Sequence, residues 1–348
     1  LEPPARAQML LTAATNLRTA IAQNAKNGQL YERLAQINAW QADVDARWVA
    51  LCAVEALATP TVDQRQVLAQ GRQQLATPVR VRLDELARAA LRGAFGGPLA
   101  ELWRAIAPAV QATTGVDIVK LGFSRGDKLA LKKLGDKYEP VASALASFGL
   151  DDVDVYISAG RSGFARALAG ETPILCLGAD VAVATMPQHR FAIGRAVASI
   201  AEGVATLPEL HGSELEWSLV AALRAADLPV PPVLAEQVAD QETAIAERAK
   251  VMKKHLSRKA KAAVTQIANQ KAGLGDVDGL RHGAIAVGHR AGLAWGGDLS
   301  VALAVLDVGK GGRTLADSPT ALELVAWSVS EDHLKLRDKL GIALKGTR

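Results

Sequence analysis

With 348 residues, 49% of them hydrophobic and only 4% aromatic, the chain is long enough for two domains that each bury a core. Alanine and leucine dominate while proline and glycine are dispersed, which favours packed helices over a disordered or all-β chain. The 40 basic and 36 acidic side chains leave a net charge of only +4, so the chain lacks the large basic surplus typical of nucleic-acid-binding proteins.

The N-terminal part shows a repeated helix, turn, helix pattern. Apolar residues recur at helical spacing in the first predicted helix, at Leu10, Leu11, Ala14, Leu17 and Ile21. After a polar break at residues 24–28, Tyr31, Leu34 and Ile37 form the apolar stripe of the second. This order resembles tetratricopeptide repeats, with an ordinary helical hairpin as the alternative. The resemblance covers roughly one repeat with flanking half-repeats, and such repeats stabilise one another by stacking, which implies that the chain is a fragment of a longer repeat protein.

The middle of the chain predicts helices and then a small sheet. Helices are expected over Leu83–Phe95, Leu99–Thr113 and Tyr138–Phe148. Apolar and polar residues then alternate over Val153–Ile157, the period of a half-buried strand, and a second strand is expected over Pro173–Gly178.

A helix opening at Pro187 follows, with Ile193, Val197, Ile200 and Val204 as its buried stripe. The rest of the chain is expected to be helical, in segments at Leu215–Leu228, Val233–Ala272, Leu280–Leu306 and Leu322–Leu344. The predicted fold class is therefore mainly α: helical repeat hairpins plus an α+β domain with a small sheet.

The second half resembles the HExxH zinc metallopeptidases of the HtpX and CAAX-processing type. The stretches that carry the resemblance, in order, are the strand Val153–Ser158, the apolar segment Thr172–Asp180, the helix Phe191–Gly203 and the segment His289–Leu293. It implies a zincin-like domain over residues 79–348, after a repeat region over residues 1–78.

The zinc-binding groups of that family are replaced in this chain. Where the family has Gly-His-Glu-x-x-His on one helix face, Gly194 is followed by Arg195, Ala196 and, at the second histidine, Ser199. Ile285 stands at the position of the third ligand, and the vestigial positions end with His289. Arg195 would place a permanent positive charge where the cation binds, so the resemblance implies no metal, no cofactor and no HExxH catalysis.

Other histidines offer no obvious replacement. His189, His282 and His289 lie near the same helices, but in one helix His282 and His289 would stand about 10 Å apart, too far to bind one metal directly. Cys52 and Cys176 are expected to be free, buried thiols, which fits a reducing compartment. A cytoplasmic protein without a membrane span is therefore expected, since no apolar run reaches about 18 residues.

Two glycine-flanked segments could suggest a nucleophilic serine and a phosphate-binding loop. Ser162 follows a predicted strand but lacks the Gly-x-Ser-x-Gly elbow, so a loop serine is the preferred interpretation. The run 309–313 lacks the remainder of a phosphate-loop motif and is interpreted as a flexible link.

The densest basic segment is predicted to be the solvated face of an amphipathic helix over residues 250–261. If it has a function, an acidic protein or a nucleic acid would contact Lys250, Lys253, Lys254, Arg258, Lys259 and Lys261.

The preferred function is a non-catalytic scaffold, in which the repeat helices and a degenerate peptidase-like domain bind other proteins. The alternative from the enzyme class is a hydrolase with an unrecognised metal or nucleophile site in the former substrate cleft of the peptidase-like domain. Nucleic-acid binding through the basic segment ranks third, because the charge is nearly balanced overall.

Overall fold

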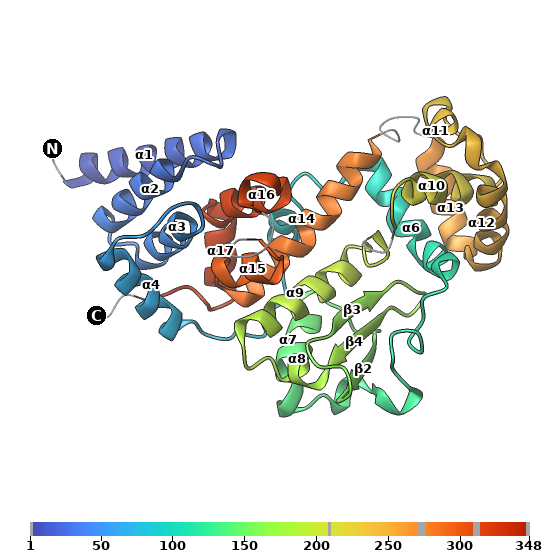
Figure 1. Ribbon diagram of the computed structural model, residues 1–348, viewed down its shortest axis with the longest axis horizontal. Helices are drawn as coiled ribbons and strands as arrows, with labels where there is room; N and C mark the ends of the chain where they lie inside the picture. The colour runs from blue at the N-terminus through green and yellow to red at the C-terminus, as the bar shows by residue number, and fades with distance from the viewer. Residues whose placement is uncertain (1–2, 208–209, 270–275, 309–313, 346–348) are drawn as a thin grey trace. The chain divides into compact units, whose positions relative to one another are not determined.

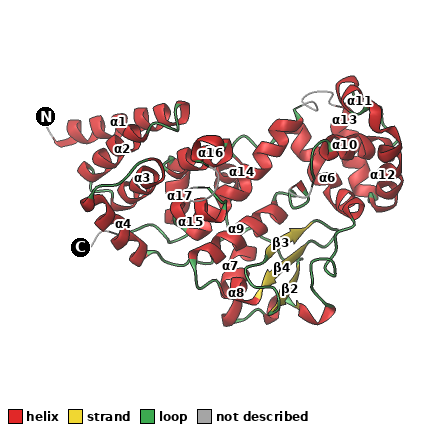
Figure 2. Cartoon of the chain, in the orientation of Figure 1, coloured by secondary structure: helices red, strands yellow, loops and turns green. Residues whose placement is uncertain are grey.

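The computed structural model describes residues 3–207, 210–269, 276–308 and 314–345. Within these residues, seventeen α-helices accompany one four-stranded sheet, which confirms the prediction of a mainly α protein with a small sheet (Figure 2). In the described part of the chain, no helix combines the length and the apolar character needed to cross a membrane.

The chain forms two compact units, each built from separate stretches of sequence. Unit 1 comprises residues 1–91, 184–194 and 289–348, and unit 2 comprises residues 92–183 and 195–288. These units do not follow the predicted boundary at residues 78 and 79, because the C-terminal helices join the N-terminal ones in unit 1. The division into a repeat region and a peptidase-like region stays a prediction.

Unit 1 is entirely helical in its described residues. Its helices are α1 (Pro3–Gln23), α2 (Gly28–Trp40), α3 (Val44–Leu57), α4 (Val62–Gln74), α5 (Glu85–Arg92, which ends one residue into unit 2), α15 (Leu299–Val305), α16 (Pro319–Ser328) and α17 (Glu331–Lys339), with a short 3₁₀ turn at Leu315–Asp317. All of these helices except α5 are labelled in Figure 1. Two longer helices, α9 (Pro187–Ala201) and α14 (Val277–Gly296), are shared between the units.

Local sequence explains where several helices of unit 1 begin. Asp43 accepts a hydrogen bond from the Ala46 amide at the start of α3, and Thr61 forms a reciprocal capping box with Gln64 at the start of α4. These caps satisfy amides that have no partner inside the helix.

The centre of unit 1 is α3. It packs against α2 and α4, and also against α15 and α16 from the other end of the sequence. Its Trp48 is 1% exposed and donates from Nε1 to the Leu68 carbonyl at 3.2 Å. A Cβ at Gly71 would lie only 2.0 Å from that indole nitrogen, so glycine is required where α4 crosses Trp48.

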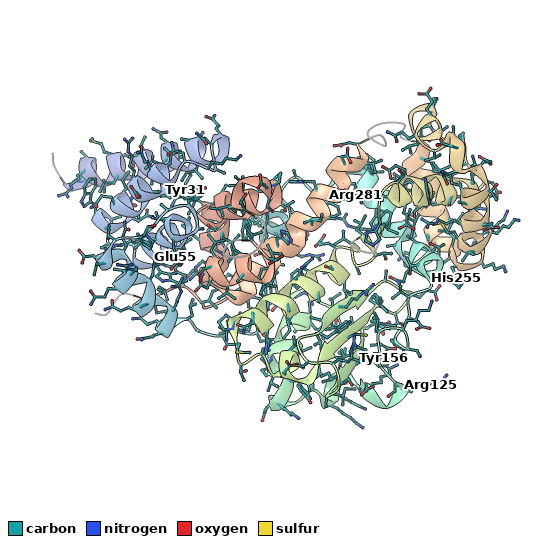
Figure 3. The ribbon with its side chains drawn as sticks, viewed as in Figure 1. Tyr31, Glu55, Arg125, Tyr156, His255 and Arg281 are labelled. Carbon is teal, nitrogen blue, oxygen red and sulfur yellow. The ribbon has the colours of Figure 1, made fainter. Side chains whose placement is uncertain are left out.

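A polar network joins α3, α4 and α15. Arg72 donates to Asp298 at 2.7 Å and to Ser300 at 2.6 Å, and it also pairs with Glu55. Burial alone lowers the pKa of Arg72, but the hydrogen bonds that it donates to Glu55 and Asp298 raise it above its ordinary value. The side chain of Glu55 is labelled on α3 in Figure 3.

Unit 2 combines the sheet with further helices. The helices are α6 (Gly97–Thr114), α7 (Glu139–Ser147), α8 (Ala179–Val183), α10 (Glu214–Ala225), α11 (Pro232–Gln237), α12 (Glu242–His255) and α13 (Arg258–Asn269). Its 3₁₀ turns lie at Arg125–Asp127, Leu131–Lys133, Asp136–Tyr138 and Ala239–Gln241. Helix α6 packs against α10, α12 and α13.

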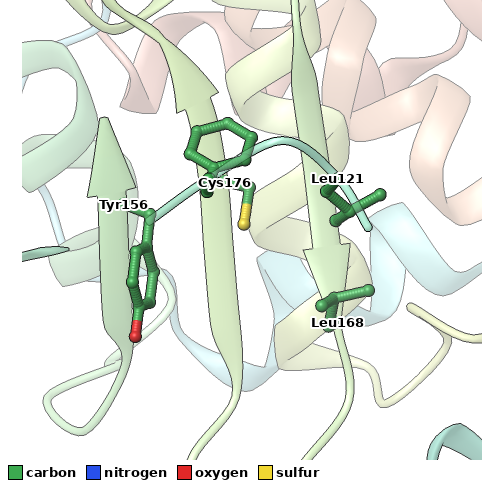
Figure 4. Close-up of a cluster of buried hydrophobic side chains, with 5 residues drawn as sticks. Leu121, Tyr156, Leu168 and Cys176 are labelled. Atoms are coloured by element: carbon green, nitrogen blue, oxygen red, sulfur yellow. The ribbon is translucent and has the colours of Figure 1, made fainter. Parts of the chain in front are cut away.

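The sheet has the order β1-β2-β4-β3, with β2 parallel to β4 and the outer strands antiparallel to their neighbours. Its strands are β1 (Lys128–Leu129), β2 (Asp154–Ser158), β3 (Ala165–Leu168) and β4 (Ile174–Gly178). Figure 4 shows Tyr156, Leu168 and Cys176, one from each of three neighbouring strands, in a buried cluster with Leu121 and Phe123.

The structure confirms two local predictions. The stripe predicted for α9 is buried, with Ile193 and Val197 fully inaccessible, although its last member, Val204, lies beyond the end of α9 at Ala201. Cys52 and Cys176 are both free and buried, and burial raises the pKa of the Cys176 thiol to about 12.

Two local predictions were wrong, and two strands were missed. The strand over Val153–Ile157 was expected to be half-buried, but Val155, Tyr156 and Ile157 are all buried, because both faces of β2 are covered. Strands β1 and β3 were missed because each is short and lacks a clear alternation. The single helix expected at Leu322–Leu344 is instead α16 and α17, separated where Ser330 caps α17.

Candidate functional site

The two helices that carry the peptidase resemblance, α9 and α14, pack against each other through glycines. In unit 1, a Cβ at Gly194 would lie 2.7 Å from the Ala291 carbonyl oxygen, and one at Gly292 would lie 2.7 Å from the ring of Phe191. In unit 2, a Cβ at Gly288 would lie 3.3 Å from Cγ of Arg195. The two contacts in unit 1 need a residue without a side chain, whereas the contact at Gly288 is with a flexible side chain.

The vestigial positions of α9 are close to α14 within unit 2. Arg195 and Ser199 both lie within van der Waals reach of a Cβ built at Gly288, which stands three residues after Ile285. Ser199 Oγ donates to the Arg195 carbonyl at 2.8 Å, so its hydroxyl stabilises its own helix. Ala196 is buried, and Ile285 is partly buried.

The positive charge of Arg195 opposes the binding of a metal cation at these positions. Burial lowers the pKa of Arg195 from its ordinary value, and no carboxylate contributes to that shift. Because even a lowered arginine pKa leaves the guanidinium protonated near neutral pH, the position keeps a positive charge.

The three histidines considered as replacement metal ligands do not all lie in the same unit. His189 and His289 are buried in unit 1, whereas His282 is exposed in unit 2. Across the part of the chain that the structure describes, no three histidine, cysteine, aspartate or glutamate side chains form a group that could hold a metal.

Ser162 lies in a turn that a carboxylate organises. Its Oγ donates to Asp180 at 2.7 Å, and the Gly163 amide donates to the same carboxylate at 2.9 Å. This arrangement is typical of a loop held against the start of α8, with the serine acting as a donor. The glycine-rich run at 309–313 lies outside the described residues.

The predicted basic helix over residues 250–261 is wrong as a single helix. Helix α12 ends at His255, labelled in Figure 3, and α13 begins at Arg258. Leu256 takes an extended conformation, and Ser257 Oγ accepts from the Ala260 amide at 3.1 Å, so an N-cap interrupts the helix.

The basic side chains around this break are partly neutralised. Lys253 and Lys261 both pair with Asp227, at 3.2 and 2.9 Å. Lys250, Lys254, Arg258 and Lys259 are exposed, as a solvated face requires. Val251, an apolar residue between these basic side chains, is exposed as well.

A cavity of about 650 Å³, lined by both polar and apolar side chains, lies in unit 1, between α1 and the turn from α2 to α3. We call it the α1–α2 cavity; it is lined by Arg6, Ala7, Leu10, Leu11, Trp40, Gln41 and Asp43. Leu11 and Trp40 are 55% and 57% exposed, which is unusual for side chains of this size and marks candidate binding surface.

Sequence reasoning did not single out Trp40, and it assigned Leu11 to the apolar stripe of the first predicted helix. A leucine on a predicted helix face is normally assigned to the core, and only the packed structure shows that this one has no cover among the described residues.

No family model, no curated protein and no solved structure matches the chain. The resemblances to tetratricopeptide repeats and to HExxH metallopeptidases therefore stay predictions that rest on the residues quoted for them.

Proposed function

We propose that the chain is a non-catalytic scaffold that binds a helix of another protein at the α1–α2 cavity. The observation that carries this proposal is the exposure of Leu11 and Trp40 beside that cavity. Exposed aromatic and aliphatic side chains around a concavity are typical of protein–protein interfaces, where tryptophan is a frequent energetic anchor.

The walls of the cavity support a helical partner. They come from one helix and from the turn between two others, so the cavity can accept the apolar ridge that an amphipathic helix presents at every third and fourth residue. Arg6 and Asp43 give the rim one charge of each sign. A partner helix with an acidic and a basic residue beside its apolar ridge would complement both.

The proposal is tested by placing a photo-crosslinking amino acid at Leu11 or Trp40 in cells. A discrete protein crosslinked from both positions is expected, and it should be lost when Leu10→Glu places a charge in the cavity. Val62, which is 70% exposed on α4, provides a matched control position in the same unit. Equal crosslinking from Val62, a band unaffected by Leu10→Glu, or a second copy of this chain as the captured protein would overturn the proposal.

The absence of a metal site is tested separately by elemental analysis of the protein purified without a histidine tag or added metal. Less than about a tenth of an equivalent of zinc, iron or manganese is expected, since Arg195, Ala196 and Ser199 cannot serve as the ligands of the HExxH family. About one equivalent would contradict a vestigial site and would favour the hydrolase alternative.

A further inference from the structure

A second cavity in unit 1, of about 600 Å³, lies between the end of α1, its turn into α2, and α16. Basic side chains come from three separate places: Arg18 on α1, Lys26 in the turn and Arg290 near the end of α14. Glu323 is the one acidic residue in its lining. The cavity therefore has a surplus of positive charge, and the chain brings it together from positions that are far apart in sequence.

Hydrogen bonds hold the two arginines in place and use only some of their N–H donors. Arg18 Nε donates to the Val329 carbonyl at 3.0 Å, and Arg290 donates to the Leu91 carbonyl at 3.2 Å. Arg290 also pairs with Glu323. A guanidinium has five N–H donors, so these bonds leave each arginine with further N–H groups for a ligand.

The nearest acids do not fully offset the cost of burying Arg18. Its ion pair with Glu331 is long, at 3.5 Å, and burial lowers the pKa of Arg18 although Glu331 and Asp43 act to raise it. An anion entering the cavity would stabilise this guanidinium.

The remaining lining is mainly apolar, and it also includes the polar residues Gln23, Asn24 and Ser330. Trp327 and Leu322 are each 8% exposed, and Ala22 and Ala326 lie beside them in the wall. The volume falls within the range of small-molecule sites, which combine apolar walls with a few polar groups that orient the ligand.

From this combination we infer that the cavity binds a small amphipathic carboxylate, in which an anionic carboxylate meets Arg18 and Lys26 and an apolar group packs on Trp327 and Leu322. A small ligand is favoured over an acidic peptide because the positive charge is confined to one cavity of limited volume. This inference does not depend on the proposed scaffold function, which uses a different surface.

The test is calorimetric titration of the full chain with octanoate, with octanol as the uncharged analogue, inorganic phosphate as the anion without an apolar group, and a short glutamate-containing peptide. Octanoate is expected to bind saturably and more tightly than the other three. Binding of octanol as tight as octanoate would remove the role of the cations, and binding of the peptide or of phosphate alone would replace the amphipathic carboxylate with another ligand.

Variants identify the site. Arg18→Gln and Lys26→Gln should each weaken octanoate binding by about tenfold, since each removes a charge-assisted hydrogen bond. Arg33→Gln, an exposed arginine on α2 outside the cavity, is the matched control and should bind as the parent does. Ala326→Leu narrows the cavity without changing any charge and should also weaken binding. Unchanged affinity in all three cavity variants, or equal weakening by Arg33→Gln, would overturn the assignment.

Discussion

Arg337 is a fully buried charged side chain whose partners come from both ends of the sequence. Its guanidinium donates to both carboxylate oxygens of Asp45, at 2.7 and 2.8 Å, and to the Gly297 carbonyl at 2.9 Å. Asp45 also accepts from the Leu344 amide at 2.9 Å, and Trp48 stacks over the guanidinium at 5.3 Å. A buried ion pair is stable only when its hydrogen bonds are completed in this way.

Removing one partner of this pair is expected to be costly. Asp45→Ala leaves the Arg337 charge buried without its carboxylate, and we expect it to lower the free energy of unfolding by about 3–5 kcal/mol, measured by denaturant titration. The double variant Asp45→Leu, Arg337→Met should recover much of that loss, because neither charge is then buried. Lys335→Gln, which breaks an exposed pair with Glu331, should change stability little. An Asp45→Ala protein as stable as the Lys335→Gln protein would contradict the argument.

His333 makes unit 1 sensitive to acid. Its ring is buried against Trp327, and Nδ1 hydrogen-bonds the Ser328 carbonyl at 2.5 Å, whereas Nε2 has no partner among the described residues. Burial, together with the nearby charge of Arg337, lowers the pKa of His333 to about 3. The unfolded chain then binds a proton that the folded chain excludes, so the stability that depends on neutral His333 is complete above about pH 6.5 and is lost as the pH falls toward 3.

The corresponding measurement is the unfolding free energy of the parent and of His333→Asn between pH 7 and pH 4. The parent should lose up to about 1.4 kcal/mol per pH unit more than the variant over this interval. His255→Asn, at the exposed end of α12, should keep the pH dependence of the parent. Parallel curves for the parent and His333→Asn would show that His333 does not titrate on unfolding.

At the scale of elements, the pairing of α9 with α14 depends on where a side chain can be tolerated. Gly194→Ala would bring a Cβ within 2.7 Å of a backbone oxygen, and we expect a loss of about 1–3 kcal/mol in unfolding free energy. Gly288→Ala meets only the flexible chain of Arg195 at 3.3 Å and gains helix propensity, so its net effect should be small. Equal thermal shifts in the two variants would mean that helix propensity, rather than close packing, controls both positions.

Helices and buried strands were predictable because their information is local. The stripe from Ile193 to Val204 repeats with the period of a helix, and the apolar run of β4 is bounded by Pro173 and Gly178. The break at Ser257 was missed because the apolar spacing continues through it, and only the capping bond to Ala260 separates the two helices. The cavity with Arg18, Lys26 and Arg290 could not be predicted, because no local pattern relates α1 to α14 and α16.

At the scale of the whole molecule, unit 1 is complete only when the C-terminal helices pack against the N-terminal helices. The Arg337–Asp45 pair joins residues 292 positions apart, and Arg72 pairs with Asp298 across 226 positions. Long-range pairs of this kind are formed at a high entropic cost, so the N-terminal helices are expected to acquire their full stability late, after the last helices are available.

This order of assembly predicts what deletion of residues 319–348 would do. The deletion removes α16, α17 and Arg337, and thereby uncovers α3 and leaves Asp45 without its cation. Hydrogen exchange should show that the amides of α3 lose most of their protection, while those of β2 in unit 2 keep theirs and serve as an internal reference. If α3 stayed as protected as in the full chain, the first four helices would form a self-sufficient repeat module, and the pairs that close unit 1 would add binding surface rather than stability.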